Sequence, residues 1–119
     1  MNKFTAMLAE RHSLSRVCAG REKKEVDEIL DTPLTILDCS MTVENLEIDG
    51  IPTEFACVVF AEYPDYYFCA GTKLTAICRD IISLADANNI SIQEMDIRIK
   101  LHKVKTKGNN TFTDVLFLN

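Results

Sequence analysis

The chain has 119 residues, of which 47% are hydrophobic and 26% are charged. This length and balance are typical of one soluble globular domain with a single core. They exclude collagen, a long coiled coil and a disordered tail. No apolar run approaches the ~20 residues that a membrane helix needs. Charged residues interrupt the N-terminal apolar stretch, so we expect neither a membrane contact nor a secretory signal.

The five cysteines are spread along the chain without a CxxC pair, at Cys18, Cys39, Cys57, Cys69 and Cys78. Their spacings do not match the closely paired ligands of a structural zinc site, so we expect no metal and no other cofactor. Free cysteine packs as a small hydrophobe, and Cys39, Cys57 and Cys78 fall on apolar faces of their segments. Because unpaired thiols are typical of reducing compartments, we predict a cytoplasmic protein.

Charge is unevenly distributed along the sequence. Residues 1–24 contain six basic and two acidic residues, whereas 25–72 contain eleven acidic residues and no lysine or arginine. Residues 73–107 contain seven basic and four acidic residues. The net charge of −5 argues against general affinity for nucleic acid, but it leaves room for a focused basic site, because salt screens charges more than ~8–10 Å apart.

Residues 1–32 are predicted to form a helical segment that precedes the main domain. Apolar residues recur at helical spacing in 1–19. Gly20 is expected to end that helix. Residues 21–30 have a thin apolar face that suits one further short helical turn.

The main domain is predicted to begin with a long, bent strand. Apolar and polar residues alternate from Leu37 to Val43, which indicates a half-buried strand. The phase of the alternation changes before Leu46, so we predict a β-bulge near Glu44–Asn45 that bends the strand. Asp49-Gly50 then predicts a hairpin turn.

Two strands, one helix and two further strands are expected after that turn. In chain order these are a central strand over 53–62, a strand over 66–70, a helix that opens at Gly71 with Thr72 as N-cap and ends at Asn88-Asn89, a strand over 95–104, a turn-rich basic loop over 105–110 and a strand over 111–118. The sequence therefore predicts a mainly β (α+β) domain over 33–119, in the order strand, strand, strand, helix, strand, strand.

That order resembles the OB-fold, a five-stranded Greek-key barrel that binds oligonucleotides on strands two and three and on nearby loops. The segments VVFAEYPDYYFCAGTKLTAICRDI and IRIKLHKVKTKGNNTFTDVLF are similar to the small single-stranded-DNA-binding or replication-accessory proteins of phages and conjugative elements of Gram-positive bacteria. The resemblance implies a five-stranded OB-like barrel that binds single-stranded DNA during replication or recombination. The printed sequence ends LFLN and not in the acidic recruiting tail usual for bacterial single-strand-binding proteins, so recruitment through such a tail is not expected.

Binding of a single strand requires aromatic rings for the bases and a positive groove for the phosphates. We predict Tyr63, Tyr66 and Tyr67 as stacking residues, because a phenol tolerates a half-exposed position, although rings in a central strand usually pack in the core. The predicted phosphate contacts are Lys73 at the helix start and the basic residues of the fourth strand and its loop, namely Arg98, Lys100, His102, Lys103, Lys105 and Lys107. We expect the tyrosines and this basic loop to frame one trough.

The acidic residues of 25–72 oppose this interpretation, since Glu54 and Glu62 flank the predicted second strand. We hypothesise that the acidic side chains lie away from the basic hairpin that carries Lys103, Lys105 and Lys107. The alternative function is an OB-like adaptor or inhibitor that binds a basic protein partner through its acidic surface. No motif of a known catalytic site occurs, so we expect no enzyme. The sequence leaves open whether the ligand is DNA or RNA and whether the chain forms a homo-oligomer.

Overall fold

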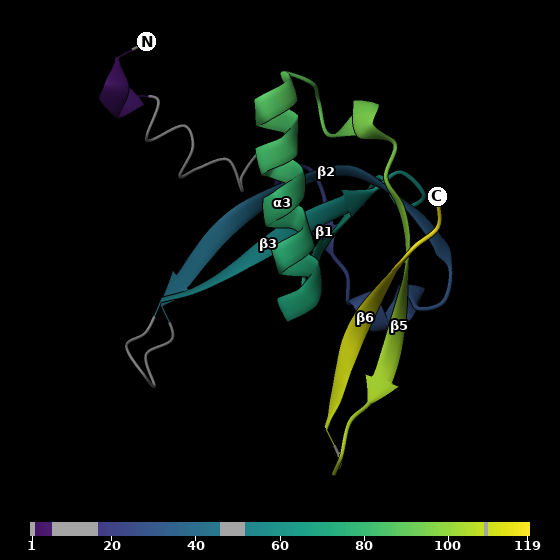
Figure 1. The fold of residues 1–119 in the computed structure, drawn as a ribbon. Helices are drawn as coiled ribbons and strands as arrows, with labels where there is room; N and C mark the ends of the chain where they lie inside the picture. The colour runs from purple at the N-terminus through teal and green to yellow at the C-terminus, as the bar shows by residue number, and fades with distance from the viewer. Residues whose placement is uncertain (1, 6–16, 46–51, 109) are drawn as a thin grey trace.

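The computed structural model describes residues 2–5, 17–45, 52–108 and 110–119. In chain order its elements are β1 (Glu22–Lys23), the 3-10 helix η1 (Val26–Ile29), β2 (Pro33–Asn45), β3 (Pro52–Phe60), β4 (Tyr66–Cys69), α3 (Thr72–Asn88), the 3-10 helix η2 (Gln93–Met95), β5 (Arg98–Lys105) and β6 (Thr111–Phe117). From β2 onwards the predicted order of strands and helix is confirmed. The described part of the chain is mainly β with one long helix across the sheet (Figure 1).

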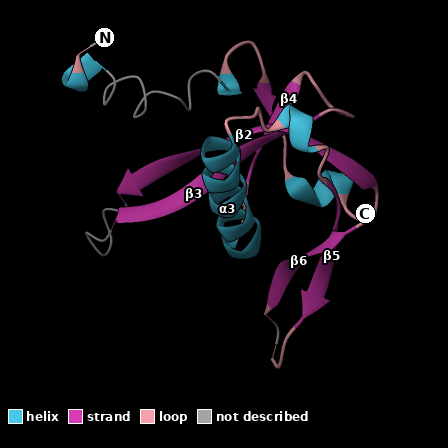
Figure 2. Ribbon diagram, turned by 45° about the horizontal axis from the view of Figure 1, so that its top comes forward, coloured by secondary structure: helices cyan, strands magenta, loops and turns pink. Residues whose placement is uncertain are grey.

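The prediction of a five-stranded barrel is wrong. Within the described residues six strands form one mixed sheet in the order β1-β4-β3-β2-β5-β6, with β1 and β6 at its two edges. Only Pro33–Thr35 of β2 pair with β5, while Ile36 and residues 38–45 pair with β3. Because β2 leaves β5 so early, the β2–β3 and β5–β6 ribbons diverge on either side of α3 (Figure 2) and the sheet stays open.

The predicted bulge at Glu44–Asn45 is also wrong in position. β2 pairs regularly with β3 as far as Asn45, and the register shift lies between Ile36 and Asp38. The extra residue, Leu37, packs on the face of the sheet opposite α3, whereas Ile36 is buried on the α3 face. The strand therefore bends near its beginning, where it changes partner from β5 to β3.

The main core lies between α3 and the sheet. Apolar residues of α3 recur every three or four positions and face the strands, as predicted, with Leu74, Cys78 and Ile81 buried there. A smaller cluster of Val17, Cys57 and Val59 lies on the opposite face. Apolar side chains on both faces of β3 explain why this strand is central.

The ends of α3 follow from backbone conformation. Asn89 adopts the left-handed conformation (φ 52°) that ends the helix, which confirms the predicted C-terminal cap. The N-cap is Gly71, whereas Thr72, predicted for that role, is the first helical residue. One turn later Thr75 is buried, where its Oγ1 accepts the Ala56 N–H at 3.2 Å and donates to the Ala70 carbonyl at 3.3 Å. This side chain fixes α3 to β3 and β4.

The N-terminal helix prediction falls largely outside the described residues, as does the hairpin at Asp49-Gly50. Gly20 has φ 71° in the turn that follows the helical residues Val17–Cys18, consistent with the predicted stop. The single helical turn predicted for 21–30 is wrong for its first part, because Glu22–Lys23 form a strand parallel to β4.

The fourth predicted strand begins later than expected, because residues 93–95 form η2 and β5 starts at Arg98. Its inward and outward positions are as predicted: Ile99 and Leu101 are buried, while His102 is exposed. Among the described helices, none combines the length and the apolar character needed to cross a membrane.

Candidate nucleic-acid interface

The three predicted stacking tyrosines lie in or beside β4 and are half-buried. Tyr63 and Tyr66 pack against the main core, and the Tyr63 ring meets Phe68 edge-on at a centroid distance of 6.3 Å. The Lys24 Nζ lies 4.4 Å from the Tyr66 ring centroid. A base would have to displace this ammonium to stack there, because a cation over an aromatic face is already a favourable contact.

Tyr67 lies on the opposite face of the sheet, beside a cluster of three thiols. Burial raises the pKa of the Tyr67 phenol above its ordinary value, and the neighbouring Cys18, Cys69 and Cys57 raise it further. The ring packs against the smaller apolar cluster on that face. The alternation of β4 therefore separates Tyr66 from Tyr67, as the sequence predicted, but neither ring stands free.

The structure does not bring the tyrosines and the basic loop together. In the sheet, β4 is separated from β5 by β3 and β2. Neighbouring strands are ~4.8 Å apart, so three strand steps place the two strand axes roughly 14 Å apart. The β5–β6 ribbon also points away from the rest of the sheet (Figure 1). The tyrosines and the basic loop expected to frame one trough therefore lie on strands that are not neighbours in the sheet.

Four of the predicted phosphate-binding side chains already contact a carboxylate. Lys73 contacts Asp114, Arg98 lies 3.4 Å from Asp96, His102 Nδ1 lies 2.8 Å from Asp31 Oδ1, and Lys103 Nζ lies 2.8 Å from Asp27 Oδ1. All eight side chains remain partly exposed, so each pair contributes little to stability. They nevertheless place a carboxylate beside each of the four cations that a phosphate would approach.

The hypothesis that the acidic residues lie away from the basic hairpin is therefore wrong for Asp27, which contacts Lys103, and Asp31 contacts the neighbouring His102. Asp27 and Asp31 belong to the acidic stretch 25–72 and contact β5 directly. Two others do lie elsewhere. Glu62 accepts the Thr35 N–H at 2.6 Å, and Glu54 lies 3.4 Å from Arg79 of α3.

Three of the predicted cations have no carboxylate partner within the described ranges: Lys100, Lys105 and Lys107. Lys105 and Lys107 are exposed at the far end of the β5–β6 ribbon, whose residues 102–108 and 110–114 we call the arm. The arm ends in a turn in which Gly108 has φ 87°, a conformation that favours glycine.

Phe112 on the arm was missed by the sequence reasoning. It lies opposite Val104 in the β5–β6 ladder and is 45% exposed. Its neighbours Thr111 and Thr113 occupy the other face of the ribbon. The sequence does carry a signal for this residue. It is a single aromatic residue between two threonines, and it follows a lysine-rich predicted strand.

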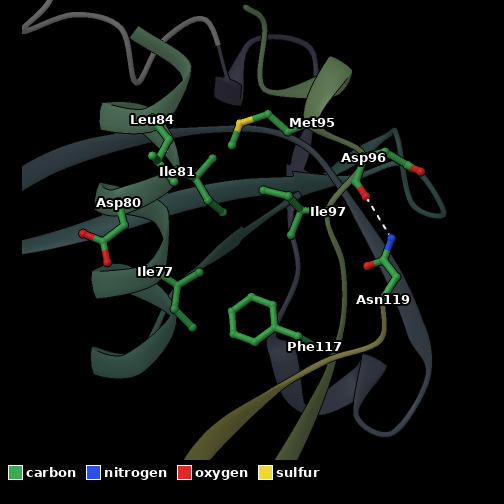
Figure 3. Close-up of a pocket in the computed structure, with 9 residues that line it drawn as sticks. All are labelled: Ile77, Asp80, Ile81, Leu84, Met95, Asp96, Ile97, Phe117 and Asn119. Carbon is green, nitrogen blue, oxygen red and sulfur yellow. Dashed lines mark hydrogen bonds between the residues drawn. The ribbon is translucent and has the colours of Figure 1, made fainter. Parts of the chain in front are cut away.

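An apolar pocket of about 370 Å³ lies between α3 and the start of the β5–β6 ribbon (Figure 3). Ile77 and Ile81 of α3 face Phe117 and Ile97 across it, and the Asp80 carboxylate points away. Its walls offer few polar groups, so it lacks the donors that would orient a charged ligand.

Among the described residues, no three histidine, cysteine or acidic side chains are placed to hold a metal ion. Comparison of the chain with protein-family models, with characterised proteins and with solved structures finds no match.

Proposed function

We propose that the chain is a non-catalytic protein that binds single-stranded DNA, in replication or recombination of a phage or mobile element, and that the arm makes the main contact. The observation that carries this proposal is the exposed ring of Phe112 on a ribbon whose Lys105 and Lys107 have no described carboxylate partner. A ring and nearby unpaired cations are the two elements of single-strand binding without sequence preference.

Lys100 adds a cation on the Phe112 face of the ribbon, whereas Lys105, which lies opposite Thr111, is on the other face. Lys100 lies two residues before His102 on the face that also carries Val104 and Phe112, since alternate residues of a strand share a face. The tyrosines of β4 are left out of the proposed contact, because their rings are half-buried and lie three strands away.

The architecture supports an OB-like arrangement that is open on one side. The order from β2 to β6, the bent β2 and the helix between β4 and β5 are the supporting features. The function involves no covalent change and requires no cofactor. All five cysteines are free thiols, so we place the protein in the cytoplasm.

Binding can be measured by fluorescence anisotropy of a labelled oligo-dT in 20 mM salt, followed by a salt titration to 200 mM. Each phosphate contact contributes a slope of about 0.7 in the plot of log affinity against log salt. Three unpaired lysines therefore predict a slope of roughly 2. Absence of binding in 20 mM salt would refute the proposed function.

Two variants locate the site on the arm. Lys105→Ala with Lys107→Ala should weaken binding equally for oligo-dT and a mixed sequence and reduce the salt slope by about 1.4. Phe112→Ala should weaken binding about 5- to 150-fold, the range for losing one stacked base. The matched control is Lys23→Ala, which removes an exposed cation from β1 at the other edge of the sheet. Equal losses of affinity in the Lys105/Lys107, Phe112 and Lys23 variants would exclude the arm as the binding site.

The alternative of an acidic adaptor for a basic protein partner is less well supported. Asp27, Asp31 and Asp114 are engaged with cations of the same chain. An adaptor would have to break these pairs before its acidic surface could meet a partner.

A further inference from the structure

The segment that connects β1 to β2, residues 25–32, places two carboxylates on adjacent residues of β5. Both oxygens of Asp27 lie close to Lys103 Nζ, at 2.8 and 2.9 Å. Asp31 Oδ1 lies 2.8 Å from His102 Nδ1. The partners are 76 and 71 residues apart in the sequence, so the contacts are made by the fold and not by local geometry.

The position of this segment does not depend on those ionic contacts. Ile29 is buried in the main core, with 1% of its surface exposed. The Asp31 N–H donates to the Leu101 carbonyl at 2.8 Å, and the Thr32 hydroxyl donates to the Ile29 carbonyl at 2.9 Å. Apolar burial and backbone hydrogen bonds therefore hold the two carboxylates against β5.

A carboxylate on a lysine or a histidine takes the place that a phosphate oxygen would occupy, because both are anionic acceptors of charge-assisted hydrogen bonds. The side chains of Asp27 and Asp31 are 58% and 60% exposed. Exposed pairs of this kind are weak. An incoming phosphate can displace them, but binding must then overcome both the loss of the pair and the repulsion from two fixed negative charges.

We propose that residues 25–32 act as an internal anionic competitor that lowers the affinity of the arm for nucleic acid by covering Lys103 and His102. This inference rests on the proposed function, and it specifies how that site is regulated. The segment leaves Lys105 and Lys107 available for a first contact. Lys103 and His102 become available only when phosphates replace the carboxylates.

The test is the double variant Asp27→Asn with Asp31→Asn in the full chain. Asparagine preserves the size of both side chains and tolerates the left-handed conformation of residue 31, where φ is 61°. Affinity for oligo-dT in 20 mM salt should rise about 2- to 30-fold, the range for releasing two exposed pairs. The salt slope should increase by about 0.7, because Lys103 then binds one additional phosphate.

The matched control is Glu22→Gln with Asp65→Asn, which makes the same change in net charge at exposed positions near β1 and β4. It should change the affinity less than twofold. If the control gains as much as the Asp27/Asp31 variant, the gain reflects net charge and the competitor is refuted, while binding by the wild-type chain still supports the proposed function. If neither the wild type nor the variants bind in 20 mM salt, the function itself fails.

A second set of variants tests whether the gain in affinity comes from breaking the Asp27–Lys103 pair and not from a change in folding. Asp27→Asn should increase affinity in the wild-type background and should have a smaller effect when combined with Lys103→Gln, because the pair is then absent and only the repulsion between Asp27 and the phosphates remains to be relieved. An equal gain in both backgrounds would overturn the proposal. Thermal unfolding followed by circular dichroism shows that each variant is folded at the temperature of the binding measurement.

Discussion

Lys73 at the start of α3 and Asp114 on β6 form an ion pair at the free edge of the sheet. The same carboxylate accepts the N–H of Val115 at 2.9 Å. Leu118 donates its N–H to Arg98 of β5, so the odd-numbered residues of β6 direct their N–H groups outwards. The Asp114 carboxylate therefore covers the outward N–H of Val115 near the middle of an edge strand. Unpaired backbone groups at such an edge can pair with a strand of another chain.

Asp114→Ala should increase self-association through β6. The substitution frees the Val115 N–H and releases Lys73, while the exposed Phe112 and Leu116 remain on the strand. Sedimentation should show a higher average mass than for the wild-type chain at the same concentration. Asp80→Ala, which removes an exposed carboxylate from α3, is the control. An unchanged mass for Asp114→Ala would show that the ion pair does not protect the edge.

Acid should weaken the contribution of Asp114 to stability. The hydrogen bond from Lys73 lowers the pKa of Asp114, and the Val115 N–H lowers it further. A carboxyl whose pKa is lower in the folded state stabilises the protein above its unfolded pKa, near 4, and loses that effect as pH falls through the folded pKa. Urea unfolding should therefore show a difference between wild type and Asp114→Asn at pH 6 that shrinks at pH 3. A difference that does not depend on pH would contradict this linkage.

Replacing Thr75 by valine should destabilise the chain, although the shape of the side chain is preserved. The Ala56 N–H would lose its acceptor, and a buried donor without a partner costs about 1–3 kcal/mol. The free energy of unfolding in urea measures this loss. Ser83→Ala on the exposed side of the same helix should change it by less than about 0.5 kcal/mol. Equal effects of the two substitutions would mean that the Thr75 hydroxyl does not fix α3 to the sheet.

The helix and the main strands could be predicted because their residues repeat with a clear period. Leu74, Cys78 and Ile81 mark one face of α3, and Asn89 marks its end. β1 could not be predicted, since its two exposed residues carry no alternation and its pairing rests on backbone bonds such as Lys24 N–H to the Tyr67 carbonyl. The bulge could not be placed from the sequence, because the apolar pattern changes phase after residue 43 although β2 pairs regularly with β3 as far as Asn45. The actual bend lies at Leu37.

The site was harder to predict, because sequence distance hides charge pairing. Blocks of acidic and basic residues suggested separate surfaces, yet Asp27 and Lys103 meet through the fold of the sheet. The proposed stacking role of Phe112 depends on the β5–β6 register, which places this residue on the arm opposite Val104. The identity of the basic residues was readable in the sequence, but which of them remain unpaired was not.

Cys57 should react with maleimide more slowly than Cys69 in the native protein. The two residues are directly opposite each other on β3 and β4, with their Sγ atoms 3.9 Å apart. Burial raises the pKa of the Cys57 thiol, and the nearby Cys69 and Cys18 raise it further. The thiolate is the reactive form, so at pH 8 labelling of Cys57, followed by mass spectrometry, should lag behind that of the partly exposed Cys69. In urea the two should react at similar rates, and equal rates in the native state would show that Cys57 is accessible and ionised.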